Sequence, residues 1–188
     1  AAFSVCVYCI GVKQNRLRFC TYDIIPPKEQ GDSFFMKRLL IFSDSHGHIN
    51  DCLKIIENSE HIDAVIHAGD YTRDAEDIQS VFPDIPMYYV KGNNDFFSNA
   101  PGELTFIIGG ARIFLTHGHD YRVKYESNYR TLVSRAKKAE ADLCIFGHTH
   151  IAHTSLEGNM TLLNPGSIRF GKTYATARIE NGKVYTSV

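Results

Sequence analysis

Five short apolar runs in the chain are each followed at once by a cluster of Asp, Asn or His residues. The runs are short, continuous and apolar, as expected for strands that are buried on both faces of a sheet. With their clusters, they read LLIFS-DSHGH, AVIHAG-DYTRD, MYYVKG-NND, IFLT-HGHD and LCIF-GHTH. Because the carboxyl ends of strands in an open α/β sheet lie at one edge, we expect the five clusters to converge in space.

Helical and hairpin patterns surround these strands. Apolar residues with helical spacing predict helices over residues 50–60, 74–82 and 121–141, the last being the longest, and Asn50 is a candidate N-cap of the first. Gly109-Gly110 and Asn181-Gly182 are two-residue turns between apolar runs, which predict antiparallel hairpins. Strand-helix alternation followed by hairpins predicts an α/β (α+β) chain with helices packed on a mixed sheet.

The composition excludes several classes of protein. With 188 residues, 44% of them hydrophobic, the chain can bury a real core, and its net charge of −1 gives no sign of a basic nucleic-acid surface. No apolar stretch approaches the roughly 20 residues that span a bilayer. The five cysteines are an odd number, and Cys52 and Cys144 fall in expected core elements. This pattern predicts a reducing, cytoplasmic location rather than a disulfide framework.

The stretch PPKEQGDSFFM separates residues 1–35 from a predicted domain over residues 36–188. Residues 1–35 are either a small added hairpin or a non-native upstream segment, and the sequence leaves both open. Cys6 and Cys9 have the C-x-x-C spacing of a zinc ligand pair, but no fourth ligand is evident before His46. We therefore favour the interpretation that both are ordinary residues of an apolar strand.

The polar clusters predict a metal site. The candidate ligands are Asp44, His46, Asp70, Asn93, His117, His148 and His150. A single Asp or Asn after a strand is usually a turn former or a helix cap, but seven Asp, Asn and His residues together, always at strand ends, favour metal binding. This mixture of Asp, Asn and His suits Mn²⁺, Zn²⁺, Fe or Ni²⁺. Seven ligands are too many for one tetrahedral zinc but suit two ions that share a carboxylate.

These motifs resemble those of the calcineurin-like metallophosphoesterases. Asp44-x-His46, Gly69-Asp70, Gly92-Asn93, His117-Gly118-His119 and Gly147-His148-x-His150 carry the resemblance over residues 36–188. The short spacing and the later NPGS stretch are most similar to the small YfcE-type phosphodiesterases of bacteria and archaea. The resemblance implies a metallophosphoesterase-like β-sandwich of two mixed sheets flanked by helices.

The resemblance also implies a chemistry. One ion would be held by Asp44, His46 and His150, and the other by Asn93, His117 and His148. Asp70 would bridge the two divalent ions, for which Mn is the first choice and Ni, Zn or Fe the alternatives. A hydroxide that bridges the ions would attack the phosphorus of a small phosphoester substrate in line.

One position departs from the family pattern. Many members have His after the ligand Asn, as the general acid, whereas this chain has Asn94, and a carboxamide is not an effective proton donor. His119, His48, a metal-bound water or a restriction to good leaving groups are the alternatives. Arg169 is either a phosphate contact or part of a surface ion pair. The candidate catalytic residues are therefore His119, Asn94 and Arg169.

Other residues near the motifs have less specific interpretations. Tyr71, Phe96 and Phe97 either wall a substrate pocket or pack loops, and we interpret His61, His67 and His153 as surface or core residues. Rival functions are a phosphomonoesterase or a nuclease of the same superfamily, or a non-catalytic protein-interaction scaffold, for which the retromer subunit that resembles this family is a precedent. The complete set of seven ligands favours an enzyme. Association into a homo-oligomer stays open.

Overall fold

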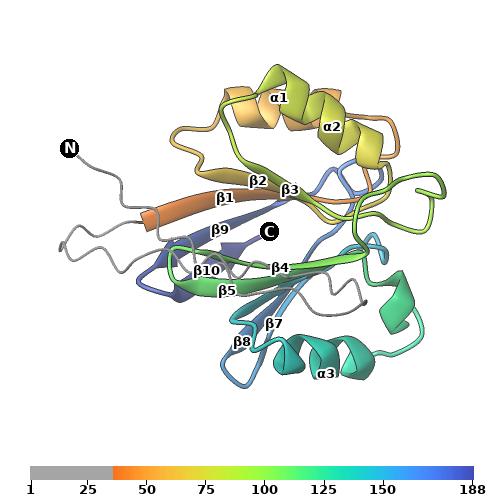
Figure 1. The fold of residues 1–188 in the computed structure, drawn as a ribbon, viewed down its shortest axis with the longest axis vertical. Helices are drawn as coiled ribbons and strands as arrows, with labels where there is room; N and C mark the ends of the chain where they lie inside the picture. Colours follow the sequence, from red (N-terminus) through yellow and green to blue (C-terminus); the bar gives the residue numbers. More distant parts are fainter. Residues whose placement is uncertain (1–35) are drawn as a thin grey trace, which may run out of the picture. The chain divides into compact units, whose positions relative to one another are not determined.

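The computed structural model describes residues 36–188, and the predictions about residues 1–35, including the hairpin and the Cys6–Cys9 pair, lie outside this range. The described chain forms two five-stranded sheets that pack face to face, with helices on their outer faces (Figure 1). Each sheet mixes parallel and antiparallel pairs. This arrangement confirms the predicted sandwich of two mixed sheets flanked by helices.

The first sheet has the strand order β10-β9-β1-β2-β3. Its strands are β1 (Met36–Phe42), β2 (Ala64–His67), β3 (Met87–Tyr89), β9 (Ala175–Glu180) and β10 (Lys183–Ser187). β1, β2 and β3 run parallel, and β9 and β10 pair antiparallel at the other side of β1. The three parallel strands therefore end at one edge of the sheet.

The second sheet has the strand order β4-β5-β6-β8-β7. Its strands are β4 (Glu103–Ile108), β5 (Ala111–Thr116), β6 (Leu143–Ile145), β7 (Ala152–Glu157) and β8 (Met160–Pro165). The central strands β5, β6 and β8 run parallel, and the edge strands β4 and β7 pair antiparallel. The two central strands that precede His-rich loops, β5 and β6, are thus neighbours.

Helices cover the outer faces of the sandwich. They are α1 (Asn50–Glu57), α2 (Thr72–Val81), α3 (Arg130–Lys138) and the short 3-10 helix η1 (His119–Tyr121). α1 and α2 lie on the first sheet, and α3 lies on the second (Figure 1). None of the helices among residues 36–188 is long and apolar enough to cross a membrane.

Apolar side chains fill the space between the two sheets. Ile41 and Ile66 from the first sheet meet Ile113, Leu143 and Leu163 from the second in one buried cluster. Each such side chain, when fully buried, contributes about 1.5–3 kcal/mol. A separate cluster under α1 includes Cys52, and one under α3 includes Cys144; both cysteines are buried and free. The core therefore fixes both sheets and aligns their strand ends.

The two glycine-containing turns confirm the predicted hairpins. Gly109 and Gly110 have φ values of 57° and 83°, and Asn181 and Gly182 have φ values of 51° and 78°. Two consecutive left-handed residues form the type I′ turn, whose twist matches that of the flanking strands. The register follows from these turns, since Ile108 pairs with Ala111.

Two local predictions were wrong. The predicted helix over residues 121–141 is a helix only from Arg130 to Lys138, because Arg122 and Tyr129 are in the left-handed region, with φ values of 56° and 51°. Asn50 is the first helical residue rather than the N-cap, which is Ile49 and offers no side-chain cap. Before residue 130, the apolar side chains of Tyr121, Val123 and Tyr129 pack into the cluster under α3 without being part of that helix.

Candidate metal centre

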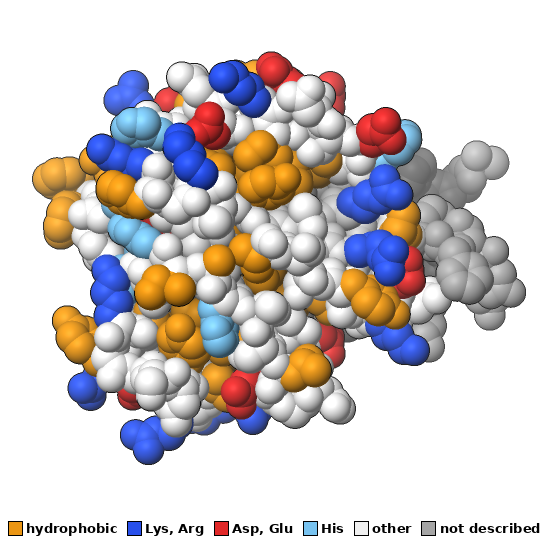
Figure 2. Space-filling model, turned by 180° about the vertical axis from the view of Figure 1, so that it is seen from behind, with side chains coloured by type: hydrophobic (Ala, Val, Ile, Leu, Met, Phe, Trp, Pro, Cys, Tyr) orange, Lys and Arg blue, Asp and Glu red, His pale blue; other side chains and the backbone are white. Residues whose placement is uncertain are grey.

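The predicted ligands come together where the strands of both sheets end. The loops that follow β1, β2, β3, β5 and β6 gather at one edge of the sandwich, on the right in Figure 1. Seen from behind, histidine, lysine and arginine side chains lie at this edge among projecting hydrophobic ones (Figure 2). The sequence-based expectation that these clusters converge is met.

Asp44 lies at the centre of the site and is fully buried. Its Oδ2 atom accepts hydrogen bonds from the Ser43 hydroxyl at 2.6 Å and from the backbone N–H of His148 at 3.0 Å. Its own backbone N–H donates to the carbonyl of Gly69 at 3.1 Å. Asp44 therefore ties together loops that follow β1, β2 and β6.

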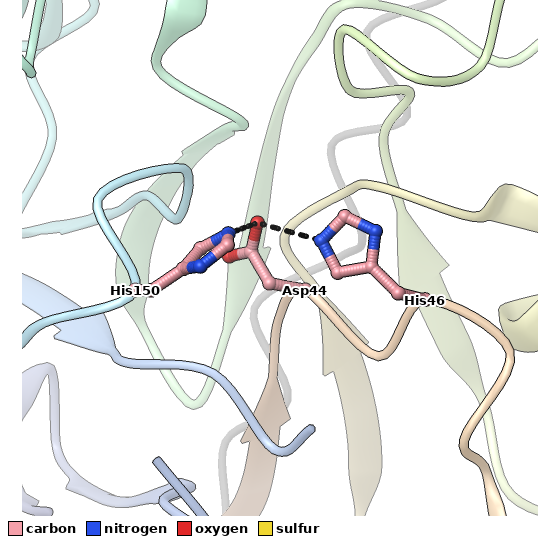
Figure 3. A group of neighbouring side chains, drawn as sticks. All are labelled: Asp44, His46 and His150. Atoms are coloured by element: carbon pink, nitrogen blue, oxygen red, sulfur yellow. Dashed lines mark ion pairs between the residues drawn. The ribbon is translucent and has the colours of Figure 1, made fainter. Parts of the chain in front are cut away.

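The other carboxylate oxygen of Asp44 is unsatisfied. Its Oδ1 atom is buried and has no hydrogen-bond partner among the described residues. It faces the Nε2 atoms of His150 at 3.1 Å, His46 at 3.9 Å and His117 at 3.9 Å (Figure 3 shows the first two). The Nε2 atom of His46 is also buried, and it too has no hydrogen-bond partner within residues 36–188. Buried polar atoms without partners are costly, and a bound cation would satisfy both of these.

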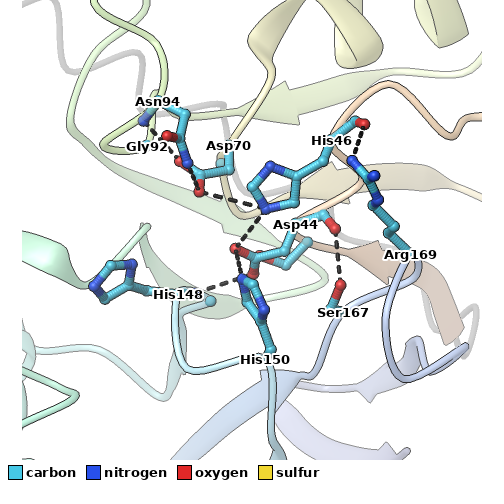
Figure 4. Close-up of polar contacts among 12 residues, drawn as sticks. Asp44, His46, Asp70, Gly92, Asn94, His148, His150, Ser167 and Arg169 are labelled. Atoms are coloured by element: carbon cyan, nitrogen blue, oxygen red, sulfur yellow. Dashed lines mark hydrogen bonds and ion pairs between the residues drawn. The ribbon is translucent and has the colours of Figure 1, made fainter.

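Asp70 lies between the histidines of the two predicted ion sites. Its Oδ2 atom is 3.7 Å from Nε2 of His46, and its Oδ1 atom is 3.4 Å from Nε2 of His117. Asn94 holds the carboxylate on its far side, with its backbone N–H donating to Oδ1 at 3.0 Å and its side-chain amide donating to Oδ2 at 2.6 Å (Figure 4). One carboxylate thus presents one oxygen to each group of imidazoles.

His117 and Asn93 face each other with unshared electron pairs. The Nδ1 atom of His117 is 2.8 Å from the carbonyl of Ala68, which can only accept, so Nδ1 carries the proton. In the neutral ring Nε2 is then an acceptor, and it lies 3.2 Å from the amide oxygen of Asn93. The ring of His148 lies beside it, 5.0 Å from that of His117 between centroids. A cation between these atoms would satisfy acceptors that cannot satisfy one another.

Three of the predicted ligands have pKa values that are shifted in the direction that metal binding requires. Burial lowers the pKa of His46 below its ordinary value, and burial together with the neighbouring His117 lowers the pKa of His148 to about 4. Burial acts to raise the pKa of Asp44, but the contacts with His150 and His117 outweigh it and hold that pKa below its usual value. At neutral pH Asp44 is therefore ionised, and His46 and His148 are neutral, as metal ligands must be.

The backbone of the loops is constrained around the ligands. Asp44, His46, Asp70, His148 and His150 all have left-handed φ values, between 45° and 68°. Residues other than glycine rarely adopt this region, and they concentrate at functional sites, where the surroundings enforce the strain. Three short turns thus carry five of the seven predicted ligands at this edge of the sandwich.

Glycines that precede the ligands leave no room for a side chain. A Cβ atom at Gly92 would lie 2.0 Å from Oδ1 of Asp70, and one at Gly147 would lie 2.8 Å from Oδ2 of Asp44. One at Gly69 would lie 2.9 Å from Cβ of His117. The glycines of the Gly-Asp, Gly-Asn and Gly-His pairs are therefore needed because one loop packs closely on another at these positions.

A buried polar chain that the sequence interpretation missed supports the loop after β1. The Ser45 hydroxyl donates to Oδ2 of Asp74 at 2.6 Å and lies 2.9 Å from Nε2 of His67, and the backbone N–H of Gly47 donates to the same Asp74 oxygen at 2.7 Å. All three side chains are buried. The burial of His67 agrees with our interpretation of it as a core residue. Through its contact with Ser45, His67 also orients the loop after β1. Its distance in sequence from Ser45 hid this role.

The NPGS stretch supports the site from the other side. Asn164 donates through its amide to the carbonyl of Gly147 at 2.8 Å, and the Ser167 hydroxyl donates to the carbonyl of Asp44 at 2.8 Å. The stretch was visible in the sequence, but nothing there indicated which loops it holds. Its role in the structure is to fix two loops that carry predicted ligands.

The three candidate catalytic residues occupy different places. Asn94 is bonded to Asp70, as described. The ring of His119 lies 6.1 Å from that of His148 between centroids, and its Nδ1 atom is buried without a partner among the described residues. Arg169 donates to the carbonyl of His46 at 3.0 Å (Figure 4), and its guanidinium lies over the ring of Phe170. Arg169 thus lies at the site, where it holds a loop carbonyl.

The remaining candidates lie around the rim. His48 is exposed, and its Nδ1 atom lies 3.1 Å from the carbonyl of His46. The ring of Tyr71 packs edge-on against that of His46, whereas Phe96 and Phe97 are exposed. The other predicted non-site histidines lie elsewhere: His61 is exposed, and His153, on β7, packs against Tyr129 at the start of α3.

Comparison with known proteins agrees with this geometry. Residues 36–182 match the calcineurin-like phosphoesterase superfamily domain. The chain is 35% identical over 153 residues to a protein named probable metallophosphoesterase YsnB from Bacillus subtilis, a match that covers 76% of the chain and 85% of that protein. It is 28% identical over 144 residues, 67% of the chain and 81% of the relative, to phosphodiesterase MJ0936 of Methanocaldococcus jannaschii.

A solved structure shares the fold. The crystal structure of a predicted phosphoesterase from Streptococcus pneumoniae superposes with a TM-score of 0.66 at 29% identity, and the match covers 81% of the chain and 95% of that structure.

Proposed function

Since the chain belongs to the calcineurin-like phosphoesterase superfamily, we propose that it is a phosphodiesterase that works with two divalent metal ions. The observation that carries this proposal is the unsatisfied Oδ1 atom of Asp44, which lies buried among three imidazole nitrogens. A buried carboxylate oxygen in such surroundings is best explained as a cation ligand. The name of the archaeal relative supports a diester as the substrate.

We assign the ligands as two groups that share Asp70. Asp44, His46 and His150 have ligand atoms within 4.8 Å of one another, which suits one ion. Asn93, His117 and His148 suit the other, and Asp70 presents one oxygen to each group. Asp44 also lies close to Asp70 and His117, so its carboxylate adds negative charge to both sites. The mixture of Asp, Asn and His favours Mn²⁺, with Ni²⁺, Zn²⁺ or Fe as alternatives.

The chemistry that the ions supply, when bound, is activation of water and neutralisation of charge on the phosphoryl oxygens. The protein's part is to hold the ligands in place and to orient the ester. Ala68 fixes the tautomer of His117, and Asn94 fixes the rotation of Asp70. Such outer contacts change metal affinity or activity by about 10- to 100-fold when removed. Arg169, which donates to the His46 carbonyl, is the candidate contact for a phosphate oxygen.

Asn94 has a different role from the His that many relatives carry at its position. Its amide and its backbone N–H both donate to Asp70, so it positions a ligand rather than donating a proton to the leaving group. His119 is the candidate general acid, because its ring lies next to those of His117 and His148 and its Nδ1 atom has no partner among the described residues.

A matched pair of histidine variants tests the proposal. His150 and His61 both have left-handed φ values, 60° and 51°, which Asn tolerates, but only His150 lies at the site. With Mn²⁺ present, wild type and His61→Asn should cleave bis-p-nitrophenyl phosphate, and His150→Asn should lose about 100-fold or more in kcat/KM. Equal activity of the two variants would remove His150 from the metal centre.

The substrate screen decides between rival functions. The metal-loaded protein should prefer bis-p-nitrophenyl phosphate to p-nitrophenyl phosphate, and treatment with a chelator should abolish both activities. A preference for the monoester would make the protein a phosphomonoesterase, and cleavage of single-stranded DNA would make it a nuclease. A protein that binds no metal and cleaves none of these substrates would fit the scaffold function.

A further inference from the structure

A groove of about 910 Å³ opens next to the metal centre, between α2 and the loop of residues 94–101. It shares two lining residues with the surroundings of the bridging carboxylate. Tyr71 follows Asp70 in the chain and packs against His46, and Asn94 donates two hydrogen bonds to Asp70. A molecule bound at the ions would therefore extend directly into this groove.

Three aromatic side chains wall the groove and are exposed to solvent. Phe97 is fully exposed, Phe96 is 83% exposed and Tyr71 is 43% exposed. Large apolar side chains that cluster on a surface beside a functional site usually mark a binding surface. Figure 2 shows projecting hydrophobic side chains at the edge of the molecule where the strand-end loops lie.

The loop that carries the two phenylalanines is held in place by hydrogen bonds. Asp95 accepts from the backbone N–H groups of Gly92 at 2.8 Å and of Thr72 at 2.7 Å. The Thr72 hydroxyl also donates to that of Ser98 at 2.9 Å. Because Asp95 joins the loop to the first turn of α2, Phe96 and Phe97 are exposed in a loop conformation that hydrogen bonds hold in place. Their rings are therefore preorganised for a ligand.

Polar side chains along the same groove are free to bind a ligand. Arg73, Asp77 and Asn99 line it and make no side-chain hydrogen bond or ion pair with any residue in the described part of the chain. Exposed ring faces next to free donors and acceptors suit a planar group that has an apolar face and a polar edge. An alkyl group would use the rings but not the polar groups.

On the basis of the proposed function, we infer that the groove binds the base of a nucleoside phosphodiester. The phosphodiester lies at the metal centre, and the base stacks on Phe96 or Phe97, with Tyr71 at the junction. Arg73, Asp77 and Asn99 provide hydrogen bonds to the polar edge of the base. The substrate class is therefore small phosphodiesters of nucleosides rather than of simple alcohols.

Binding can be tested without catalysis, because the chain contains no tryptophan. The variant Phe97→Trp carries a single indole in the groove, and the variant Leu156→Trp carries one at a 73% exposed position on β7 as a matched control. Thymidine 5′-monophosphate should quench the first indole saturably and leave the second unchanged, and ribose 5-phosphate should quench neither. Absence of saturable quenching, or equal quenching by ribose 5-phosphate, would overturn the inference.

A second test compares the turnover of two substrates that have the same leaving group. Thymidine 5′-(p-nitrophenyl phosphate) and ethyl p-nitrophenyl phosphate both release p-nitrophenolate, and wild type should favour the nucleoside ester by about tenfold or more in kcat/KM. The double variant Phe96→Ala/Phe97→Ala should bring this ratio to about one, and Phe96→Tyr/Phe97→Tyr should retain it. A ratio of one in wild type, or an unchanged ratio in the alanine variant, would contradict the inference. If the metal-loaded protein cleaves neither ester, the proposed function fails, and the fluorescence experiment still decides whether the groove binds the base.

Discussion

Replacing Gly92 by alanine should inactivate the protein without removing any polar group. The new Cβ atom would lie 2.0 Å from Oδ1 of Asp70 and 2.5 Å from its backbone nitrogen, whereas ordinary contact begins at 3.4 Å. The Cβ atom and the Asp70 backbone nitrogen must therefore separate by 3.4 − 2.5 = 0.9 Å, and the Cβ atom and Oδ1 by 3.4 − 2.0 = 1.4 Å. Because a backbone atom is involved, rotation of the Asp70 side chain alone cannot relieve the clash.

The displacement sets the size of the expected effect. A misplacement of about 1 Å at reacting groups can cost 100-fold in rate, so kcat/KM for bis-p-nitrophenyl phosphate should fall by about 100-fold or more. Overpacking should also lower the free energy of unfolding by about 1–3 kcal/mol. Steady-state kinetics at saturating Mn²⁺, isothermal titration with Mn²⁺ and thermal unfolding measure these effects separately.

Gly102 provides the matched control. A Cβ atom there would meet nothing within 4 Å, and neither Gly92 nor Gly102 has a left-handed φ value. Gly102→Ala should therefore keep the activity, the metal affinity and the stability of the wild type. The reasoning would be refuted if Gly92→Ala matched Gly102→Ala in all three measurements, because Asp70 would then not be held against Gly92.

Three further predictions concern the groups around the ligands. Asp74→Ala leaves the Ser45 hydroxyl and the Gly47 N–H without their acceptor, so the free energy of unfolding should fall by about 1–3 kcal/mol for each group, measured by urea titration; an unchanged midpoint would contradict this role. If His119 is the general acid, His119→Ala should slow cleavage of a phenyl phosphodiester by about 100-fold or more and that of a p-nitrophenyl diester much less, and equal losses would assign it another role. Burial lowers the pKa of His67. As the pH falls below about 6.5, this imidazole therefore binds a proton in the unfolded chain but stays neutral in the folded chain. The metal-free protein should therefore lose stability as the pH falls below about 6.5, and His67→Gln should lose less than wild type between pH 7.5 and pH 5.

Much of the fold was predictable from local patterns. The short apolar runs with polar clusters after them correspond to β1, β2, β3, β5 and β6, and the Gly109-Gly110 and Asn181-Gly182 turns occur where predicted. Such features depend on periodicity and turn chemistry, which neighbouring residues determine. The helix boundary at Arg130 was missed because Tyr129 adopts a left-handed conformation, which a tyrosine in the sequence does not predict.

The sequence predicted which residues gather at the candidate site but not which residues support their loops. Asp44 and His150 stand in motifs whose residue types suit a cation, so the sequence alone singled them out. Asp74 and Ser167 contact the site through hydrogen bonds to Ser45 and to the Asp44 carbonyl, and no local signal distinguishes them from other polar residues of the chain. Such roles depend on pairings between loops far apart in the sequence, which only a three-dimensional structure reveals.

Counting bound metal tests the central claim most directly. The protein should be stripped with a chelator, loaded with Mn²⁺, freed of excess ions by gel filtration and analysed by mass spectrometry of the elements. We predict two ions per chain in the wild type and at most one in Asp70→Ala, which should also lose nearly all turnover. A wild type that retains no metal, or an Asp70→Ala variant that retains two ions, would contradict a paired-cation centre built on this carboxylate.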